Sequence, residues 1–271
     1  MAEKTKDKVI AICYDFDKTL GPSGSSFGYG YFDALKIKED DFWAEERNSK
    51  NFLNMDKVLS YLYFAVFKAK QLNVNLTKQM LESFGKNVHY YEGVESWFER
   101  INNYAKKQGY LLEHYIISSG LKEVISNCSI AKYFKKIYAN SYIYDDNFNP
   151  IWPAYAINAT NKTQYLYRIR KNTLNESDNS VNDKFENYRV PFKNMIYVGD
   201  SETDIPCMRI VIKNGGTSIG VYDDLPNNKN LMIDLYNKNR INNFCVADYS
   251  KNSEIEKIVK KTIDKIKKDD E

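Results

Sequence analysis

The chain has 271 residues, enough for one large domain or for a core domain with an insert. Its hydrophobic fraction of 43% and its charged fraction of 28% are those of an ordinary globular protein. The net charge of +3 is spread along the chain without a basic cluster, which disfavours a nucleic-acid binder and leaves a small anionic partner compatible with the charge.

The cysteines, the histidines and the apolar runs argue against two further classes of protein. The four cysteines lie far apart and form no Cys-x-x-Cys pair, and there are only two histidines, so a zinc site is disfavoured and the thiols are typical of a reducing compartment. The apolar run that follows the charged start is too short for a signal peptide, and residues 58–67 are too few to span a membrane. We therefore expect a cytoplasmic protein without membrane association.

The first predicted strand is Val9–Tyr14, a continuous apolar run of the kind that a parallel sheet buries on both faces. It ends at Asp15-Phe-Asp-Lys-Thr-Leu20, and a turn-rich segment follows. From about residue 29 to residue 108 the apolar spacing is helical, with Thr77 as an expected N-cap and Gly109 as an expected helix end. No strand is predicted there, so we expect an all-helical insert.

Strand patterns return after the insert and alternate with helical ones. Strands are predicted at residues 114–117, 137–139, 195–198, 217–221 and 244–247, and helices from Leu121, over residues 162–170 and at residues 253–268. A hairpin is expected within residues 142–158, and polar residues 172–189 are interpreted as a mobile surface loop or, alternatively, a lid. The alternation predicts an α/β domain with a parallel sheet.

Four polar features lie at predicted strand ends or at a helix start. They are Asp15 with Asp17 and Thr19, Ser118, Lys162, and Asp200 with Asp204. In open parallel sheets the active site lies outside the carboxyl ends of the strands, so we expect these side chains to converge.

The first two features each have a functional and a structural interpretation. Asp15 and Asp17 offer an attacking carboxylate and a proton donor, or they form a turn that is acidic by chance. Ser118 offers a phosphate-binding hydroxyl beside the amides of a helix start, or it caps the helix that follows.

The lysine and the second pair of aspartates also have both a functional and a structural interpretation. Lys162 at the start of a helix opposes the helix dipole, which a nearby anion would explain, although a single lysine is more commonly exposed on the surface. Asp200 and Asp204 offer the hard oxygen ligands that suit Mg²⁺, whereas Asp204 also fits simple charge complementarity to a helix N-terminus. Taken together and in this order, the four features favour phosphate chemistry with Mg²⁺.

That order of motifs resembles the haloacid dehalogenase (HAD) superfamily, in the branch with a helical cap that is similar to phosphoserine phosphatases. The matching segments are Asp15-Phe-Asp-Lys-Thr-Leu20, Ile116-Ile-Ser-Ser-Gly120, Asn161-Lys-Thr163 and Gly199-Asp-Ser-Glu-Thr-Asp204. The resemblance implies a Rossmann-like three-layer parallel-sheet core of residues 1–21 and 110–271. It also implies a helical cap, residues 22–109, inserted between the first and second motifs.

The resemblance further implies a role for each matching residue. Asp15 would attack phosphorus and become an aspartyl phosphate, while Asp17 would act as acid and then as base. The implied phosphate-binding residues are Ser118, Ser119 and Lys162, and the implied Mg²⁺ group is Asp15, Asp17 through its backbone carbonyl, Asp200 and Asp204. Asp204 would orient either the waters of the ion or Lys162.

An aspartate two positions after the nucleophile is the mark of phosphatases and phosphomutases in this superfamily and argues against a dehalogenase. We therefore expect a Mg²⁺-dependent phosphatase acting on a small phosphorylated metabolite. The alternatives are a phosphotransferase or mutase with the same intermediate, and a non-catalytic phosphate-binding module. Lys36, Arg47 and Lys50 are candidate anion contacts in the cap, with ordinary exposed charge as the alternative. The aromatic residues at positions 27, 29, 31 and 32 either line the pocket or pack the cap.

Overall fold

The computed structural model describes residues 8–49, 54–223 and 226–271. The strands in this part of the chain form one seven-stranded sheet in the order β4-β3-β2-β1-β5-β6-β7, parallel throughout except for the antiparallel pair β3 and β4. The strands are β1 (Val9–Tyr14), β2 (Leu111–Leu121), β3 (Phe134–Tyr144), β4 (Pro150–Tyr155), β5 (Met195–Gly199), β6 (Thr217–Tyr222) and β7 (Asn243–Val246).

Strand β1 lies at the centre of this sheet, between β2 and β5. All of its residues are buried, and they alternate between two separate hydrophobic clusters. Ile10 and Ile12 pack on one face of the sheet, whereas Ala11 and Cys13 pack on the other. The uninterrupted apolar run of the sequence is thus explained, because each face of the strand is covered by helices.

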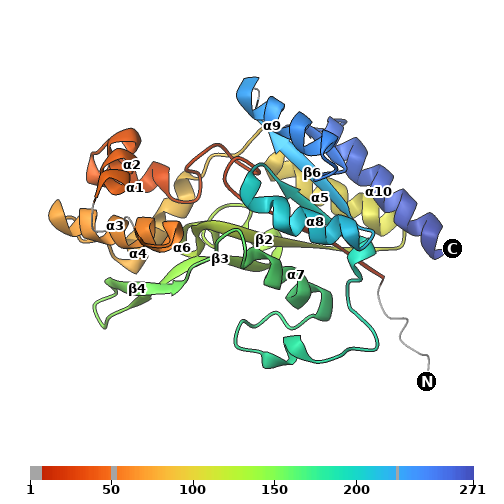
Figure 1. The fold of residues 1–271 in the computed structure, drawn as a ribbon, viewed down its shortest axis with the longest axis horizontal. Helices are drawn as coiled ribbons and strands as arrows, with labels where there is room; N and C mark the ends of the chain where they lie inside the picture. Colours follow the sequence, from red (N-terminus) through yellow and green to blue (C-terminus); the bar gives the residue numbers. More distant parts are fainter. Residues whose placement is uncertain (1–7, 50–53, 224–225) are drawn as a thin grey trace.

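Helices cover both faces of the sheet and make the three layers visible in Figure 1. Helices α5 (Val94–Lys107) and α10 (Glu254–Asp270) pack on one face, and α7 (Lys162–Lys171), α8 (Ile205–Lys213) and α9 (Pro226–Asn237) pack on the other. The predicted α/β class is confirmed. Among the described residues, no helix has the length and apolar character that crossing a membrane demands.

A second lobe holds α1 (Gly28–Leu35), α2 (Glu39–Asn48), α3 (Lys57–Gln71), α4 (Lys78–Ser83) and the 3₁₀ turn η1 (Phe84–Asn87). Aromatic residues such as Phe42 and Phe64 fill its own hydrophobic cluster. Thr77 is the N-cap of α4, as expected, because its hydroxyl accepts a hydrogen bond from the Met80 amide at 3.2 Å. We call this lobe the cap.

Helix α5 packs on the sheet and not within the cap cluster. Its apolar face, which includes Val94, Trp97, Phe98 and Ile101, belongs to the same buried cluster as β1 and α10. This packing differs from the cap boundary expected at residue 109, since helical periodicity does not tell which surface the apolar face covers. We infer that the cap helices end near residue 87.

The hairpin expected within residues 142–158 is formed by β3 and β4. Its turn is held by Asp145, whose Oδ1 accepts hydrogen bonds from the amides of Asn147 and Asn149. Tyr142 from this hairpin is buried in the cap cluster and donates to the Leu62 carbonyl oxygen at 2.6 Å. The hydrophobic cluster of the cap is therefore completed by the hairpin as well as by the cap helices.

Residues 172–189 form a surface segment with one short 3₁₀ turn, η3 (Asn179–Asn182). Arg168 donates to the backbone carbonyls of Asn175 and Glu176, at 2.7 and 2.9 Å. Ion pairs join Glu176 to Lys136 and Arg189 to Glu113, near the starts of β3 and β2. The segment thus lies at the amino ends of the strands, opposite the edge where the predicted site residues lie, which disfavours the lid interpretation.

The buried His114 on β2 links stability to pH. Its Nδ1 lies 3.1 Å from the Tyr14 hydroxyl and its Nε2 lies 2.9 Å from Asn102 Oδ1. Burial lowers the pKa of His114 from 6.5 to about 3. Below pH 6.5 the unfolded chain therefore binds a proton at this residue that the folded chain does not bind, so stability falls as the pH falls.

We expect this one residue to remove about 2 kcal/mol of the free energy of unfolding between pH 7 and pH 5. The variant His114→Gln should lose that part of the pH dependence, whatever its stability at pH 7. Urea unfolding of both proteins at the two pH values measures the difference. An equal change in the free energy of unfolding between pH 7 and pH 5 in the two proteins would contradict the assignment to His114.

Candidate active site

The buried amino group of Lys162 joins two carboxylates at the carboxyl edge of the sheet. Asp15 directly follows β1, and Lys162 is the first residue of α7. Lys162 Nζ lies 3.0 Å from Asp15 Oδ2 and 2.9 Å from Asp204 Oδ1. The side chain of Lys162 is 0% exposed, so the common outcome for a lysine, an exposed surface position, does not apply here.

Asp204, in the 3₁₀ turn η5 (Glu202–Asp204), is fully buried and satisfied on both oxygens. Oδ1 accepts from Lys162 and from the Tyr197 hydroxyl, at 2.9 and 2.8 Å. Oδ2 accepts longer bonds, at 3.3 Å each, from the amides of Asp200 and Ser201. Asp204 thus fixes Lys162 and the loop after β5, which favours a positioning role over direct contact with an ion.

This arrangement requires a glycine at the end of β5. A Cβ atom added to Gly199 would lie 2.6 Å from Cγ of Asp204, closer than real Cβ contacts come. The glycine of the Gly199-Asp200 motif is therefore explained by the approach of the Asp204 carboxylate to the backbone.

Asp17 is held by the turn that leads into the cap. Its Oδ1 accepts a hydrogen bond from the Ser26 amide at 2.9 Å, and its Oδ2 accepts one from the Ser26 hydroxyl. Burial raises the pKa of Asp17, and the two bonds from Ser26 oppose that shift. A carboxyl group with a raised pKa is suited to carry a proton near neutral pH.

Ser118 and Ser119 lie in the last part of β2, where its register with β3 shifts between Ile117 and Leu121. The helix predicted from Leu121 is the single turn α6 (Lys122–Ile125), so Ser118 does not stand at the start of a long helix. The Ser118 hydroxyl accepts from the Gly120 amide at 3.0 Å and lines the pocket described below. The Ser119 hydroxyl donates to the Ile157 carbonyl oxygen at 2.7 Å, which favours a structural role for that side chain.

The charges of the cluster do not balance. Carboxylate oxygens of Asp15, Asp200 and Asp204 lie within 4.8 Å of one another, and Lys162 is the cation that pairs with two of them. Burial raises the pKa of Asp200 well above its ordinary value, and the nearby carboxylates of Asp204 and Asp15 raise it further. Asp200 Oδ1 accepts a long bond from the Thr19 hydroxyl at 3.4 Å, while Oδ2 has no hydrogen-bond donor among the described residues.

These oxygens fit a divalent cation. An additional positive charge near Asp15 and Asp200 would remove the repulsion that raises the pKa of Asp200, and hard carboxylate oxygens are the ligands that Mg²⁺ accepts. Burial opposes the charge of Lys162, yet the carboxylates of Asp15 and Asp204 hold its pKa above the ordinary value. Lys162 therefore stays a cation, and burial raises the pKa of Asp15 against the opposing effect of Lys162.

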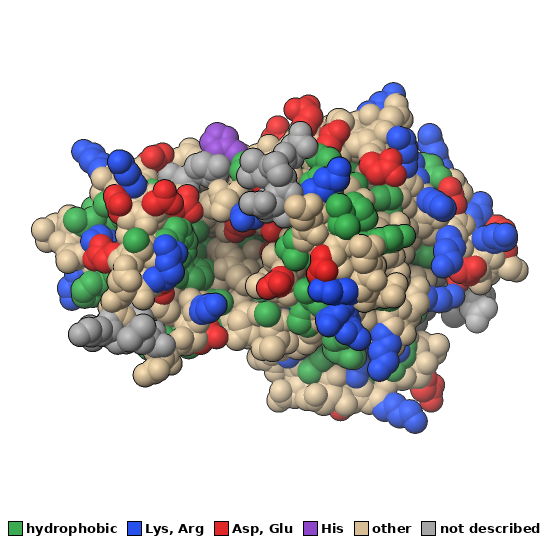
Figure 2. Space-filling model, turned by 45° about the horizontal axis from the view of Figure 1, so that its top comes forward, with side chains coloured by type: hydrophobic (Ala, Val, Ile, Leu, Met, Phe, Trp, Pro, Cys, Tyr) green, Lys and Arg blue, Asp and Glu red, His purple; other side chains and the backbone are tan. Residues whose placement is uncertain are grey.

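A pocket of about 310 Å³ opens above Asp15 and Asp17, between the cap and the sheet. The site side chains that line it are Asp15, Asp17, Ser118 and Ser119, and the cap contributes Phe27, Phe32, Glu39, Trp43 and Tyr61. Figure 2 shows the surface hollowed between the two lobes, with acidic side chains in and around the hollow.

Of the aromatic residues near the first motif, some line the pocket and others pack inside the cap. Phe27 and Phe32 line the pocket, whereas Tyr31 is buried in the cap and donates to the Ala65 carbonyl oxygen. The side chain of Tyr29 lies outside the described residues. Of the candidate anion contacts, Lys36 and Arg47 are exposed and do not line the pocket, and Lys50 lies outside the described residues.

Sequence reasoning missed several residues of the site. Tyr197 donates a hydrogen bond to Asp204 but stands in the sequence as one more residue of a buried strand. The alternation of side chains along β5 is the signal that would have placed it on the face covered by α7 and α8. Ser26, Glu39 and Tyr61 carry no motif that the sequence displays, because turns and separate cap helices bring them to the pocket.

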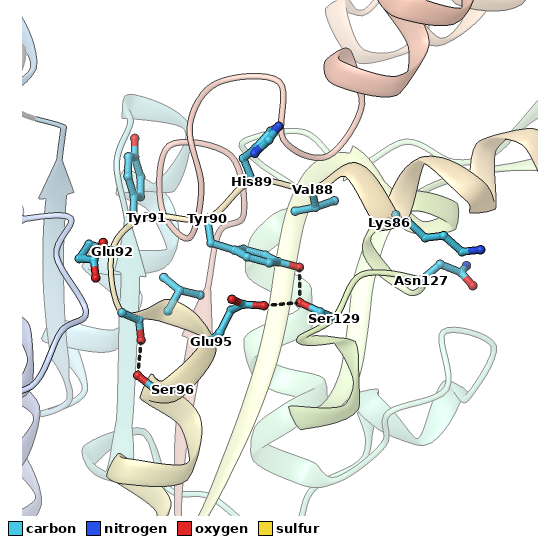
Figure 3. Close-up of a pocket in the computed structure, with 13 residues that line it drawn as sticks. Lys86, Val88, His89, Tyr90, Tyr91, Glu92, Glu95, Ser96, Asn127 and Ser129 are labelled. Atoms are coloured by element: carbon cyan, nitrogen blue, oxygen red, sulfur yellow. Dashed lines mark hydrogen bonds between the residues drawn. The ribbon is translucent and has the colours of Figure 1, made fainter.

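A larger cavity, of about 850 Å³, lies along the connection from η1 to α5. As Figure 3 shows, Ser129 bonds both the Tyr90 hydroxyl and Glu95 in its wall. None of the site residues predicted from the sequence lines this cavity. Its size alone does not make it a candidate for catalysis, since it lacks the carboxylate and lysine cluster.

Comparisons with known proteins give the same fold. No family model matches the chain. A protein from Borreliella burgdorferi (strain ATCC 35210 / DSM 4680 / CIP 102532 / B31), described only as uncharacterized, is 26% identical and the alignment covers 92% of this chain and 95% of that protein. A HAD family hydrolase from Salmonella enterica serovar Typhi superposes with a TM-score of 0.56 at 18% identity, over 87% of this chain and 66% of that one.

A phosphoserine phosphatase solved with substrate bound also has a TM-score of 0.56, at 16% identity, and covers 94% of this chain and 98% of its own. The chain therefore has the fold of HAD hydrolases in its phosphoserine-phosphatase-like form, which confirms the resemblance seen in the motifs at the level of fold.

We expect Asp204→Asn to lower the free energy of unfolding by about 3 kcal/mol, because it removes one partner of a buried ion pair with Lys162. Tyr197→Phe deletes only one hydrogen bond to the same carboxylate and should cost about 1 kcal/mol. Denaturant unfolding of both variants measures the contrast. Equal losses would show that the charge of Asp204 does not stabilise the fold.

Proposed function

We propose that this protein is a Mg²⁺-dependent phosphatase that hydrolyses a small phosphomonoester through an aspartyl phosphate on Asp15. The observation that carries the proposal is the placement of Asp15 and Asp17 in one pocket with Lys162 fixed against Asp15 at 3.0 Å. A dianionic phosphate repels an attacking carboxylate, so a buried cation beside the nucleophile is the group that this reaction needs most.

In the first step Asp15 attacks phosphorus, a bond forms between its carboxylate oxygen and phosphorus, and the bond to the leaving alkoxide breaks. Lys162 lowers the repulsion between Asp15 and the phosphoryl oxygens. Asp17 gives its proton to the leaving oxygen, which departs as an alcohol. The Ser118 hydroxyl, which lines the same pocket, would bind a phosphoryl oxygen.

In the second step water attacks the phosphorus of the aspartyl phosphate. Asp17, now ionised, takes a proton from that water, and Asp15 leaves as a carboxylate. Inorganic phosphate is released, and the proton on Asp17 restores the starting state. Ser26 keeps the Asp17 carboxyl in the same place for both transfers, since it bonds both of its oxygens.

Mg²⁺ would be held by Asp15, the Asp17 backbone carbonyl and Asp200, and would neutralise phosphoryl charge there. Asp204 keeps Lys162 and the Asp200 loop in position. The four cysteines are free and buried, as expected for a protein of the reducing cytoplasm, where we place this enzyme.

The direct test is release of p-nitrophenol from p-nitrophenyl phosphate in the presence of Mg²⁺. We expect activity that chelation of the metal removes, and a loss of at least about 10³-fold in Asp15→Asn because the amide is not a nucleophile. The matched control is Glu202→Gln, which removes an exposed acid from the turn beside the site and should keep full activity.

Full activity of Asp15→Asn would show that Asp15 is not the nucleophile. Failure of the wild-type protein on a broad panel of phosphate esters would favour the binding module. Transfer of the phosphoryl group to an added alcohol in place of water would favour the phosphotransferase.

The variant Asp17→Asn separates the two steps. p-Nitrophenol is a good leaving group that needs no proton, whereas the attacking water still needs a base. We therefore expect a rapid burst of about one p-nitrophenol per enzyme, followed by turnover slowed by about 10²-fold. Stopped-flow absorbance measures both phases. A uniform slow rate without a burst would argue against Asp17 as the base of the second step.

A further inference from the structure

The outer wall of the pocket is aromatic. Phe27 and Phe32 from the start of the cap, with Trp43 on α2 and Tyr61 on α3, all line it. Their rings meet at steep angles, since the plane of Tyr61 is tilted by 56° to Phe27 and by 66° to Trp43, with centroids 5.9 and 6.0 Å apart. Rings set at such angles enclose a corner and do not form a flat stacking surface.

Two of these rings are fixed by hydrogen bonds at their polar atoms. The Tyr61 hydroxyl donates to the Ser119 carbonyl oxygen at 2.5 Å and accepts from Asn140 at 2.8 Å. Trp43 Nε1 donates to Glu39 Oε1 at 3.0 Å. The aromatic faces are therefore held in place before any ligand binds.

Glu39 is the charged residue of this wall. It lines the pocket, forms no ion pair with a cation among the described residues, and lies near enough to Asp17 to influence it electrostatically. The bond from Trp43 engages only one of its two carboxylate oxygens. A half-buried carboxylate beside aromatic faces calls for a positive partner.

No arginine or lysine in the described part of the chain lines the pocket. Lys162 is buried beneath it between Asp15 and Asp204, while Lys18 is exposed beside the first motif. The space beyond the phosphate therefore has a negative carboxylate and aromatic faces, which attract cations, and the described residues place no cation there to receive a carboxylate of the substrate.

We propose that the substrate is the phosphomonoester of an amino alcohol, whose ammonium or quaternary ammonium group binds among Phe27, Trp43, Tyr61 and Glu39. The inference rests on the proposed function, because it assigns the leaving group of that same site. A dianionic phosphate then lies against Asp15, whose charge the buried Lys162 compensates, and the positive end of the same molecule contacts Glu39 and the aromatic faces.

Two other classes of phosphomonoester fit the wall less well. A phosphorylated hydroxy acid or an amino-acid phosphate would bring a carboxylate close to Glu39 without a described cation to pair it. A nucleoside monophosphate would need a flat surface for its base, whereas the rings enclose a corner.

The experiment compares phosphocholine with 3,3-dimethylbutyl phosphate, a neutral molecule of the same shape with carbon in place of nitrogen. We expect kcat/KM for phosphocholine to exceed that for the neutral isostere by at least about tenfold. Glu39→Gln should reduce this ratio towards one. The matched control Asp40→Asn removes an exposed acid from the same turn of α2 and should keep the wild-type ratio.

A ratio near one in the wild-type protein, or a preference for phosphoserine or adenosine monophosphate, would overturn the inference even if p-nitrophenyl phosphate is hydrolysed. Calorimetric binding of the two compounds to Asp15→Asn tests the inference without turnover. Binding of phosphocholine at least about tenfold tighter than the isostere supports it, and equal or absent binding overturns it. Failure of all hydrolysis with tight phosphocholine binding would overturn only the proposed reaction.

Discussion

The ion pair of Lys162 with Asp15 and Asp204 is the interaction on which the rest of the site depends. A lysine without solvent exposure is unfavourable unless its charge is compensated, and here two carboxylates provide that compensation at about 3 Å. The three residues come from the end of β1, the start of α7 and the turn after β5, so the pair ties together elements on both sides of the central strand. The position of Asp15 is therefore fixed by the same contacts that close this edge of the sheet.

Much of this arrangement could be predicted from the sequence, because its signals are local. The apolar run before Asp15 indicates a buried parallel strand, and parallel strands place their carboxyl ends at one edge. That reasoning brings Asp15, Lys162 and Asp200 to one place, as the structure does. The hydrogen-bond partners of these carboxylates could not be predicted. Ser26 reaches Asp17 through the shape of a turn, and Tyr197 reaches Asp204 across the end of β5.

Two elements differ from expectation because they depend on tertiary contacts, which the periodicity of apolar residues does not predict. Strand β2 resumes pairing with β3 at Leu121 after an irregular stretch, so the helix behind the serines begins at Lys122, and it is a single turn. Helix α5 has an apolar stripe that would suit either lobe, and its burial against β1 and α10 is decided by tertiary packing. The cap residues that line the pocket, such as Glu39 and Tyr61, lie on separate helices, so no contiguous sequence motif indicates them.

The hairpin that supports the cap also limits how this protein can change. Leu121, Val124 and Tyr142 belong to the hydrophobic cluster of the cap although they lie far along the chain from its helices. Removing or exchanging residues 22–87 would expose that apolar surface on the core, so the cap is not a detachable module. New selectivity can arise through individual side chains of the pocket wall, while replacement of the whole lobe would also require a new hairpin.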